Sequence, residues 1–246
     1  RAPVFMSPHN PAYYPLLAET VGLRKAKDLI VYEIDARNGY DLPSRFRTFS
    51  KTIVARNPGI AVRRLVRNKF KSEAAIILDL LNRGVTNNWG FVPVGDDEMR
   101  AIAGRLKFIL DPDAIYLVED HGRPVGCAIG FPDINVLLKE IRGKLLPTGI
   151  FHLIFGIGKV RDYRLWGLSV LPEYHGKGLD VLMYTRLYEA LEPRKVRLEA
   201  NYVLEDNYRI INALEKLGMK PIKRYRVYER AIQPRGDERT GATRTV

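Results

Sequence analysis

The chain contains very little cysteine and histidine, and it has no long apolar run. Cys127 is the one cysteine among 246 residues, which excludes an internal disulfide and fits the reducing cytoplasm. Four scattered histidines disfavour a structural zinc site, so no metal is expected. The longest apolar stretch, residues 149–158, contains glycine and falls well short of the roughly 20 residues that span a bilayer. With no signal peptide visible, the sequence predicts a cytoplasmic protein without a membrane partner.

Two common nucleotide-binding motifs are also absent, because the glycine spacing fits neither a P-loop nor a dinucleotide fingerprint. A different glycine-rich junction is present. A strand-forming run, residues 165–171, ends at Pro172, and the turn that contains Gly176, Lys177 and Gly178 leads into a helical pattern. The first amides of a helix lack partners and attract anions, so this junction fits a pyrophosphate site. The alternative is that the glycines serve only the geometry of the turn.

The formal net charge of +12 fits an anionic partner or a basic, solvated surface. Nucleic acid, an anionic membrane face and a phosphate-rich cofactor would each match it. Because Lys and Arg are spread along the whole chain, nucleic acid is disfavoured but stays open. The densest basic cluster lies within residues 56–71, and it also fits a solvated face.

An internal repeat relates the two ends of the chain, and chance similarity is the alternative. Both copies have the pattern of a helix closed by glycine and followed by a strand. The repeated residues are Asn10, Tyr14, Leu17, Gly22, Lys27, Val31 and Tyr32 near the start, and Asn207, Tyr208, Leu214, Gly218, Lys223, Val227 and Tyr228 near the end. The repeat predicts that residues 1–34 are the remnant of a first unit truncated upstream. It further predicts a connector at 35–58, a second unit at 59–232 and a flexible tail at 233–246.

The second unit alternates strand and helix patterns, which indicates an α/β domain around a central sheet. Strands are expected at 60–65, 114–119, 125–131, 164–171, 196–202 and 224–231, and helices at 72–81, 96–106, 134–141, 179–191 and 206–217.

Three parts of this unit resemble the GNAT superfamily of acyl-CoA-dependent N-acyltransferases. They are the hairpin with Arg123-Pro124-Val125-Gly126, the strand–loop–helix at 165–191, and Asn207 followed by Leu217-Gly218-Met219. More narrowly, residues 10–14, 132–135 and 204–207 resemble a bacterial group of proteins with two GNAT-like halves. The resemblance implies an α/β (α+β) fold with a mixed, mostly antiparallel sheet flanked by helices. It also implies that acetyl-CoA or another acyl-CoA is the co-substrate.

The family's pyrophosphate motif, Gln/Arg-x-x-Gly-x-Gly/Ala, falls on residues 175–180, and only Gly178 matches it. His175 replaces Gln/Arg, and Asp180 replaces a small residue and would repel a nearby phosphate. The resemblance also places the pantetheine arm along the strand edge at 168–170. Asn207 lies where the family often has an Asn near the cofactor, with helix capping as its alternative role. The expected cofactor-binding residues are Leu168, Ser169, Val170, His175, Gly176, Lys177, Gly178, Leu179, Asp180 and Asn207.

The general acid is not where the family pattern puts it. Many family members have a Tyr seven residues after this Asn, and here that position is Leu214. Tyr202 and Tyr208 are candidate substitutes, and each could instead be a packed aromatic.

Glu199 is the candidate general base. Strand alternation puts Arg197, Glu199 and Asn201 on one face, which lines either a substrate cleft or the solvent, with Glu199 paired to Arg197 in the second case.

Three functions follow from these observations. The favoured one is an acyl-CoA-dependent N-acyltransferase that acts on a primary amine of a small molecule or peptide. A non-catalytic acyl-CoA-binding module and a nucleic-acid-associated protein are the alternatives. A homodimer stays open, and the basic segment 132–163 is either a wall of the acceptor pocket or a solvated face.

Overall fold

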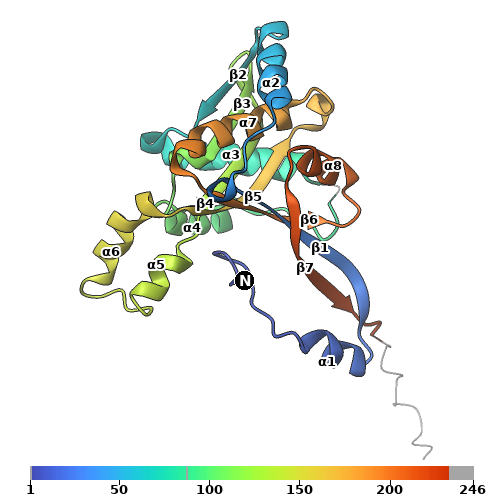
Figure 1. Ribbon diagram of the computed structural model, residues 1–246. Helices are drawn as coiled ribbons and strands as arrows, with labels where there is room; N and C mark the ends of the chain where they lie inside the picture. Colours follow the sequence, from blue (N-terminus) through green and yellow to red (C-terminus); the bar gives the residue numbers. More distant parts are fainter. Residues whose placement is uncertain (1, 87, 233–246) are drawn as a thin grey trace, which may run out of the picture.

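Seven strands form one mixed sheet in the computed structural model, which describes residues 2–86 and 88–232 (Figure 1). The predicted tail, residues 233–246, lies outside the described residues. Along the sheet the order is β2-β3-β4-β5-β6-β1-β7, and every neighbouring pair is antiparallel except β5 and β6. This confirms the predicted mixed, mostly antiparallel sheet. The strands are β1 (Arg24–Asp35), β2 (Ile60–Arg64), β3 (Ile115–Asp120), β4 (Arg123–Pro132), β5 (Asp162–Val170), β6 (Arg197–Leu204) and β7 (Lys220–Glu229).

Helices cover both faces of the sheet. Adjacent residues of β5 show this, because side chains alternate between faces along a strand. The Ser169 hydroxyl donates a hydrogen bond to the Leu80 carbonyl of α3, whereas Val170 lies on the side of Met183 in α7. The helices are α1 (Tyr14–Thr20), α2 (Ser44–Arg56), α3 (Phe70–Gly84), α4 (Asp96–Leu106), α5 (Asn135–Glu140), α6 (Gly149–Gly156), α7 (Leu179–Leu191) and α8 (Tyr208–Lys216).

The strand of the predicted remnant lies inside this sheet. β1 pairs with β6 on one side and with β7 on the other. On β1, Asp28 is 1% exposed and accepts hydrogen bonds from the Arg226 guanidinium of β7. This contact lowers the pKa of the Asp28 carboxyl to about 2. Residues 24–35 therefore share one sheet with the predicted unit at 59–232.

The first described residues cross the α3 side of the sheet as a strap, residues 2–8. The Phe5 amide donates to Asp133, and the Asn135 side chain donates to the Pro3 carbonyl. Arg164 donates to the Phe5 carbonyl, and Val4 is 1% exposed. Residues 132–135, one of the segments that carry the narrower resemblance, thus hold the strap in place.

Within the described residues, no helix combines the length and apolar character that crossing a membrane would require.

Candidate functional site

The site begins where β5 and β6 separate. These strands pair only from Asp162 to Leu165 and from Arg197 to Ala200, and beyond that point the β6-facing edge of β5 has no partner on β6. A hollow of about 800 Å³ lies there. Its walls include the end of α3 with the loop after it, residues 165–170 of β5 and residues 200–204 of β6. An unpaired strand edge beside a hollow can bind an extended amide ligand in the manner of an added strand.

The predicted glycine loop lies at the end of this edge. Gly176 and Gly178 both have left-handed backbone conformations, with φ of 79° and 77°, and Gly178 caps α7. A Cβ at Gly178 would come within 2.9 Å of Ile53 and Phe49 of α2, whereas a Cβ at Gly176 would meet nothing within 4 Å. Gly178 is therefore required both by the turn and by the packing of α2. The amides at the start of the 13-residue helix α7 lack intrahelical acceptors, which suits an anion.

The other residues predicted in this motif have different surroundings. His175 Nε2 lies 2.8 Å from the Val170 carbonyl oxygen, so its ring connects the loop to the end of β5. Lys177 Nζ lies 4.2 Å from the centre of the Tyr174 ring. Leu179 is buried under the loop, and Asp180 lines the hollow. Asp180 thus lies on the side of the loop where the sequence predicts the phosphates.

The strand residues predicted to bind the cofactor also line the hollow, but the Ser169 side chain is already used. Its hydroxyl is buried and donates to the Leu80 carbonyl at 2.6 Å. A Cβ on Gly84 would overlap the Ser169 hydroxyl, so glycine at position 84 lets α3 approach β5. Leu168, Ser169 and Val170 therefore line the hollow beside the free edge of β5, while the Ser169 side chain fixes α3.

The sequence left two roles open for Asn207, contact with the cofactor and capping of a helix, and the structure shows the second. Its side-chain oxygen accepts a hydrogen bond from the Ile210 amide at 3.2 Å, which caps α8. The residue also lines the hollow. The capping contact is present, and contact with a cofactor stays a prediction.

Glu199 is buried in an ion-pair network rather than facing the hollow. It is 1% exposed, and both of its carboxylate oxygens accept from Lys223 Nζ at 3.0 Å. Arg197 donates to it at 3.1 Å, which is the pairing that the alternative interpretation expected. Of the three residues predicted to share this face, Asn201 lines the hollow, and Arg197 and Glu199 are not among its walls.

The two candidate tyrosines have opposite environments. Tyr208 begins α8 and is 68% exposed, and it is not a wall of the hollow. Tyr202 is a wall, and its hydroxyl is buried with no hydrogen-bond partner among the described residues. Its ring lies 5.2 Å from the Arg164 guanidinium and 5.2 Å from the Tyr225 ring. Leu214, at the family's usual Tyr position, is fully buried at the wall of the hollow.

Arg164 and Tyr184 were not singled out from the sequence, and Asn201 was named only as sharing a face with Glu199. Arg164 is 3% exposed, and its Nε donates to the Asn201 side-chain oxygen at 2.5 Å. The Asn201 Nδ2 group is buried without a partner among the described residues. Burial lowers the pKa of the Arg164 guanidinium, and burial together with Asp180 raises the pKa of the Tyr184 hydroxyl. Tyr184 also lines the hollow. The one available signal was the charged Arg164 next to the apolar run that begins at Leu165.

These groups place hydrogen-bond donors and a cation at the vertex of the hollow, which is the point where β5 and β6 separate. The Asn201 amide and the Tyr202 hydroxyl are unused donors next to a buried cation. Donors fixed in a site with little water stabilise developing negative charge strongly. The arrangement can therefore bind an oxygen or a thiolate at the point where β5 and β6 part. Among the described residues no cluster of side chains could hold a metal ion.

Comparison with known proteins places the chain in a family. Residues 77–219 match the family model of the acetyltransferase (GNAT) family. Protein YghO of Escherichia coli is 30% identical over 94% of this chain, and the bacterial ceramide synthase of Caulobacter vibrioides is 28% identical over the same share. The chain spans about 60% of the length of these two relatives.

Solved structures share the fold at low identity. A GCN5-related N-acetyltransferase from Sphaerobacter thermophilus superposes with a TM-score of 0.57 at 14% identity, over 89% of this chain and 56% of that one. A tandem GNAT protein from the clavulanic acid biosynthesis pathway gives 0.53 at 13% identity, over 92% of this chain and 60% of that one. The family match and the splayed sheet agree with the resemblance seen in the sequence, and the chain belongs to the GNAT acetyltransferase family.

Proposed function

We propose that this chain is an acyl-CoA-dependent N-acyltransferase, with acetyl-CoA as the expected donor and a primary amine as the acceptor. The observation that carries the proposal is the unpaired edge of β5, which opens onto the hollow and ends at the glycine loop and the start of α7. The amides of a pantetheine arm can pair with this edge, and a pyrophosphate suits the free amides of the loop.

The reaction places the thioester at the vertex of the hollow. A neutral amine nitrogen attacks the carbonyl carbon, the C–N bond forms, and the C–S bond breaks. The nitrogen loses its proton to water, and the leaving thiolate takes a proton from a general acid. Tyr202 is the proposed acid, because the residue lines the hollow and its hydroxyl is buried with no partner among the described residues. Asn201 Nδ2 is the proposed donor to the carbonyl oxygen.

In this proposal Glu199 is a positioning residue. A buried carboxylate that binds Lys223 and Arg197 holds β6 and β7 together and does not reach the hollow. Proton removal from the amine is therefore assigned to water, and Tyr208 is given no part in the reaction.

The name of one relative, a bacterial ceramide synthase, is compatible with acyl transfer.

Two observations favour the second candidate, a non-catalytic acyl-CoA-binding module. Leu214 stands at the usual position of the acid, and the Asp180 carboxylate lines the hollow near the phosphate site.

The decisive test is titration calorimetry with acetyl-CoA, a long-chain acyl-CoA and free CoA, followed by a thiol-release assay with a panel of primary amines. Gly176→Asp should weaken CoA binding by about tenfold relative to Gly176→Asn, because the two differ in charge and not in shape. Gly178 is a poor test position since a side chain there collides with α2. Binding without turnover of any amine would favour the module, and no binding would remove both candidates.

A further inference from the structure

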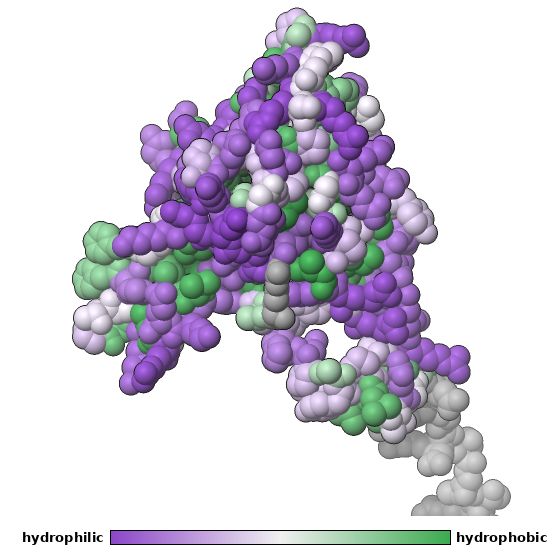
Figure 2. Space-filling model, in the orientation of Figure 1, coloured by the Kyte–Doolittle hydropathy of each residue, from purple (hydrophilic) through white to green (hydrophobic). Residues whose placement is uncertain are grey.

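The segment between β4 and β5 contains a helical hairpin whose outer surface is strongly apolar. We call residues 135–161, which include α5 and α6, the α5–α6 hairpin. The sequence analysis assigned no helix to residues 149–156, and the structure forms α6 there. Seven large apolar side chains of the hairpin are between 43% and 79% exposed: Val136, Leu145, Leu146, Ile150, Phe151, Ile154 and Phe155. The hairpin projects from the sheet in Figure 1, and Figure 2 shows hydrophobic surface over it.

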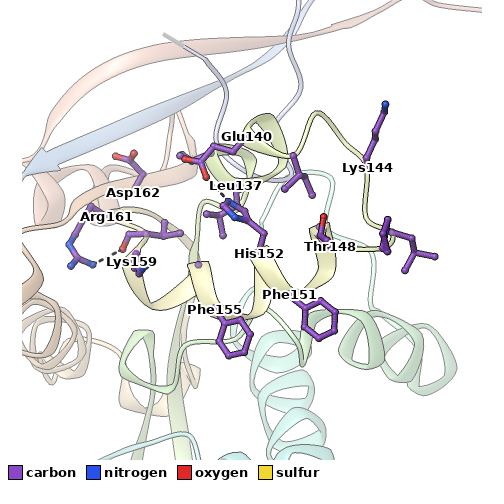
Figure 3. Close-up of a pocket in the computed structure, with 17 residues that line it drawn as sticks. Leu137, Glu140, Lys144, Thr148, Phe151, His152, Phe155, Lys159, Arg161 and Asp162 are labelled. Atoms are coloured by element: carbon purple, nitrogen blue, oxygen red, sulfur yellow. Dashed lines mark hydrogen bonds and ion pairs between the residues drawn. The ribbon is translucent and has the colours of Figure 1, made fainter.

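The exposure follows from how the two helices pack. A Cβ at Gly156 would lie 2.8 Å from Leu137, and one at Gly149 would overlap the Lys144 carbonyl, so glycine brings α6 close to the preceding segment. His152 Nε2 lies 2.6 Å from the Glu140 carboxylate and joins α6 to α5. In Figure 3, Phe151 and Phe155 point to the opposite side of α6 from this pair. The apolar surface is therefore the outer face of a packed unit.

The same hairpin is rich in exposed cations. They are Lys139, Arg142, Lys144, Lys159 and Arg161, against the single carboxylate of Glu140. Glu140 is already paired with His152, and none of the five cations has a carboxylate within 4 Å among the described residues. A hollow of about 1140 Å³ on this hairpin has Leu137, Ile141 and Phe155 in its walls beside Lys144 and Lys159 (Figure 3).

We propose that the α5–α6 hairpin seats this protein on an anionic bilayer surface, with the phenylalanines at the acyl boundary and the cations at the lipid phosphates. Exposed apolar residues combined with unpaired Lys and Arg are what an interfacial helix presents to such a surface. A second copy of the chain fits less well. A twofold contact through this face would bring five cations of each copy together without carboxylates to neutralise them. The sequence analysis predicted no membrane partner because the chain has no spanning segment, but a helix that binds at the bilayer interface needs no spanning segment.

Vesicle sedimentation of the whole chain, without CoA or amine, tests this proposal separately from the transferase reaction. The protein should pellet with vesicles that contain phosphatidylglycerol, much less with pure phosphatidylcholine, and less as salt rises. Phe151→Ser combined with Phe155→Ser should weaken binding by roughly tenfold or more, since two exposed rings that would enter the acyl boundary are lost. Phe108→Ser, at another 64% exposed phenylalanine, is the matched control and should bind normally.

A charge-reversed variant, Lys144→Glu with Lys159→Glu, should lose the preference for anionic vesicles while keeping its thermal melt. Three results would overturn the proposal. They are absence of pelleting with every vesicle, equal loss in the Phe108 control, and a change of sedimentation coefficient in the hairpin variants that indicates contact between copies instead.

Discussion

The Tyr202 hydroxyl is the side-chain group on which the proposed reaction depends most. It is buried at the wall of the hollow without a partner among the described residues, whereas the Tyr208 side chain is 68% exposed. Tyr202→Phe should reduce kcat by roughly 10²- to 10⁴-fold, because a general acid contributes about that much. Acyl-CoA affinity should stay within about threefold in the same variant.

Tyr208→Phe is the matched control for this measurement and should keep normal turnover in the thiol-release assay. Tyr184→Phe is the informative comparison, because Tyr184 lines the same hollow. If Tyr184→Phe loses turnover and Tyr202→Phe keeps it, the acid has been assigned to the wrong tyrosine.

The charge of Asp180 leads to a separate prediction about CoA affinity at the phosphate end of the hollow. Its carboxylate lines the hollow in the first turn of α7, where it favours the helix dipole but repels a bound phosphate. Asp180→Asn should therefore bind CoA more tightly by about three- to tenfold, while losing roughly 0.5 kcal/mol of stability. Calorimetry and a thermal melt measure the two effects. Unchanged affinity would mean that the carboxylate points away from the ligand.

At the scale of the elements, the contact between α3 and β5 depends on two small residues. The Ser169 hydroxyl reaches the Leu80 carbonyl across the space that a Gly84 side chain would occupy. Gly84→Ala should destabilise the fold by about 1–3 kcal/mol through overpacking. In the Ser169→Ala background the same substitution should cost clearly less, since the colliding oxygen is gone. Chemical denaturation of the four proteins in this cycle measures the coupling, and strict additivity would contradict the packing argument.

The pairing of β1 with β7 responds to pH through Asp28. The folded pKa of this carboxyl is about 2, below the ordinary value of 3.8, because Arg226 and Lys25 favour its charged form. The contact therefore stabilises the protein fully above about pH 5 and loses its effect as pH falls from about 4 toward 2. Asp28→Asn should lower the free energy of unfolding at pH 7 by on the order of 2 kcal/mol. Asp206→Asn, at an exposed ion pair with Lys27, should change it much less, because solvent screens that pair.

The sequence predicts local elements better than it predicts contacts between residues that are far apart in the chain. The strand–loop–helix at 165–191 is local, so apolar runs, Pro172 and the glycines predicted it well. The surroundings of Arg164 depend on Asn201, 37 residues away, and on Phe5, 159 residues away. The partner of Glu199 is Lys223 on another strand. Strand alternation put Glu199 and Asn201 on one face, but it could not say that Lys223 would cover the first and leave the second at the hollow.

The whole molecule carries a formal net charge of +12, and this charge acts on the two substrates of the proposed reaction with opposite sign. Acyl-CoA is an anion and is attracted, whereas a protonated primary amine is repelled before it reaches the site. Salt screens both effects over a Debye length of about 8–10 Å. Raising salt should therefore increase KM for acyl-CoA by a few-fold and decrease KM for a cationic amine.

An amine that also carries a carboxylate gives the control for this prediction, because its net charge is near zero and its KM should respond little to salt. Steady-state kinetics across a salt series, with matched pairs of amines with and without a carboxylate, make the comparison. A parallel rise of KM for acyl-CoA and for the cationic amine would contradict it. That result would mean that local ion pairs in the site outweigh the field of the whole surface, since a local pair of opposite charges weakens with salt whatever the sign of the net charge.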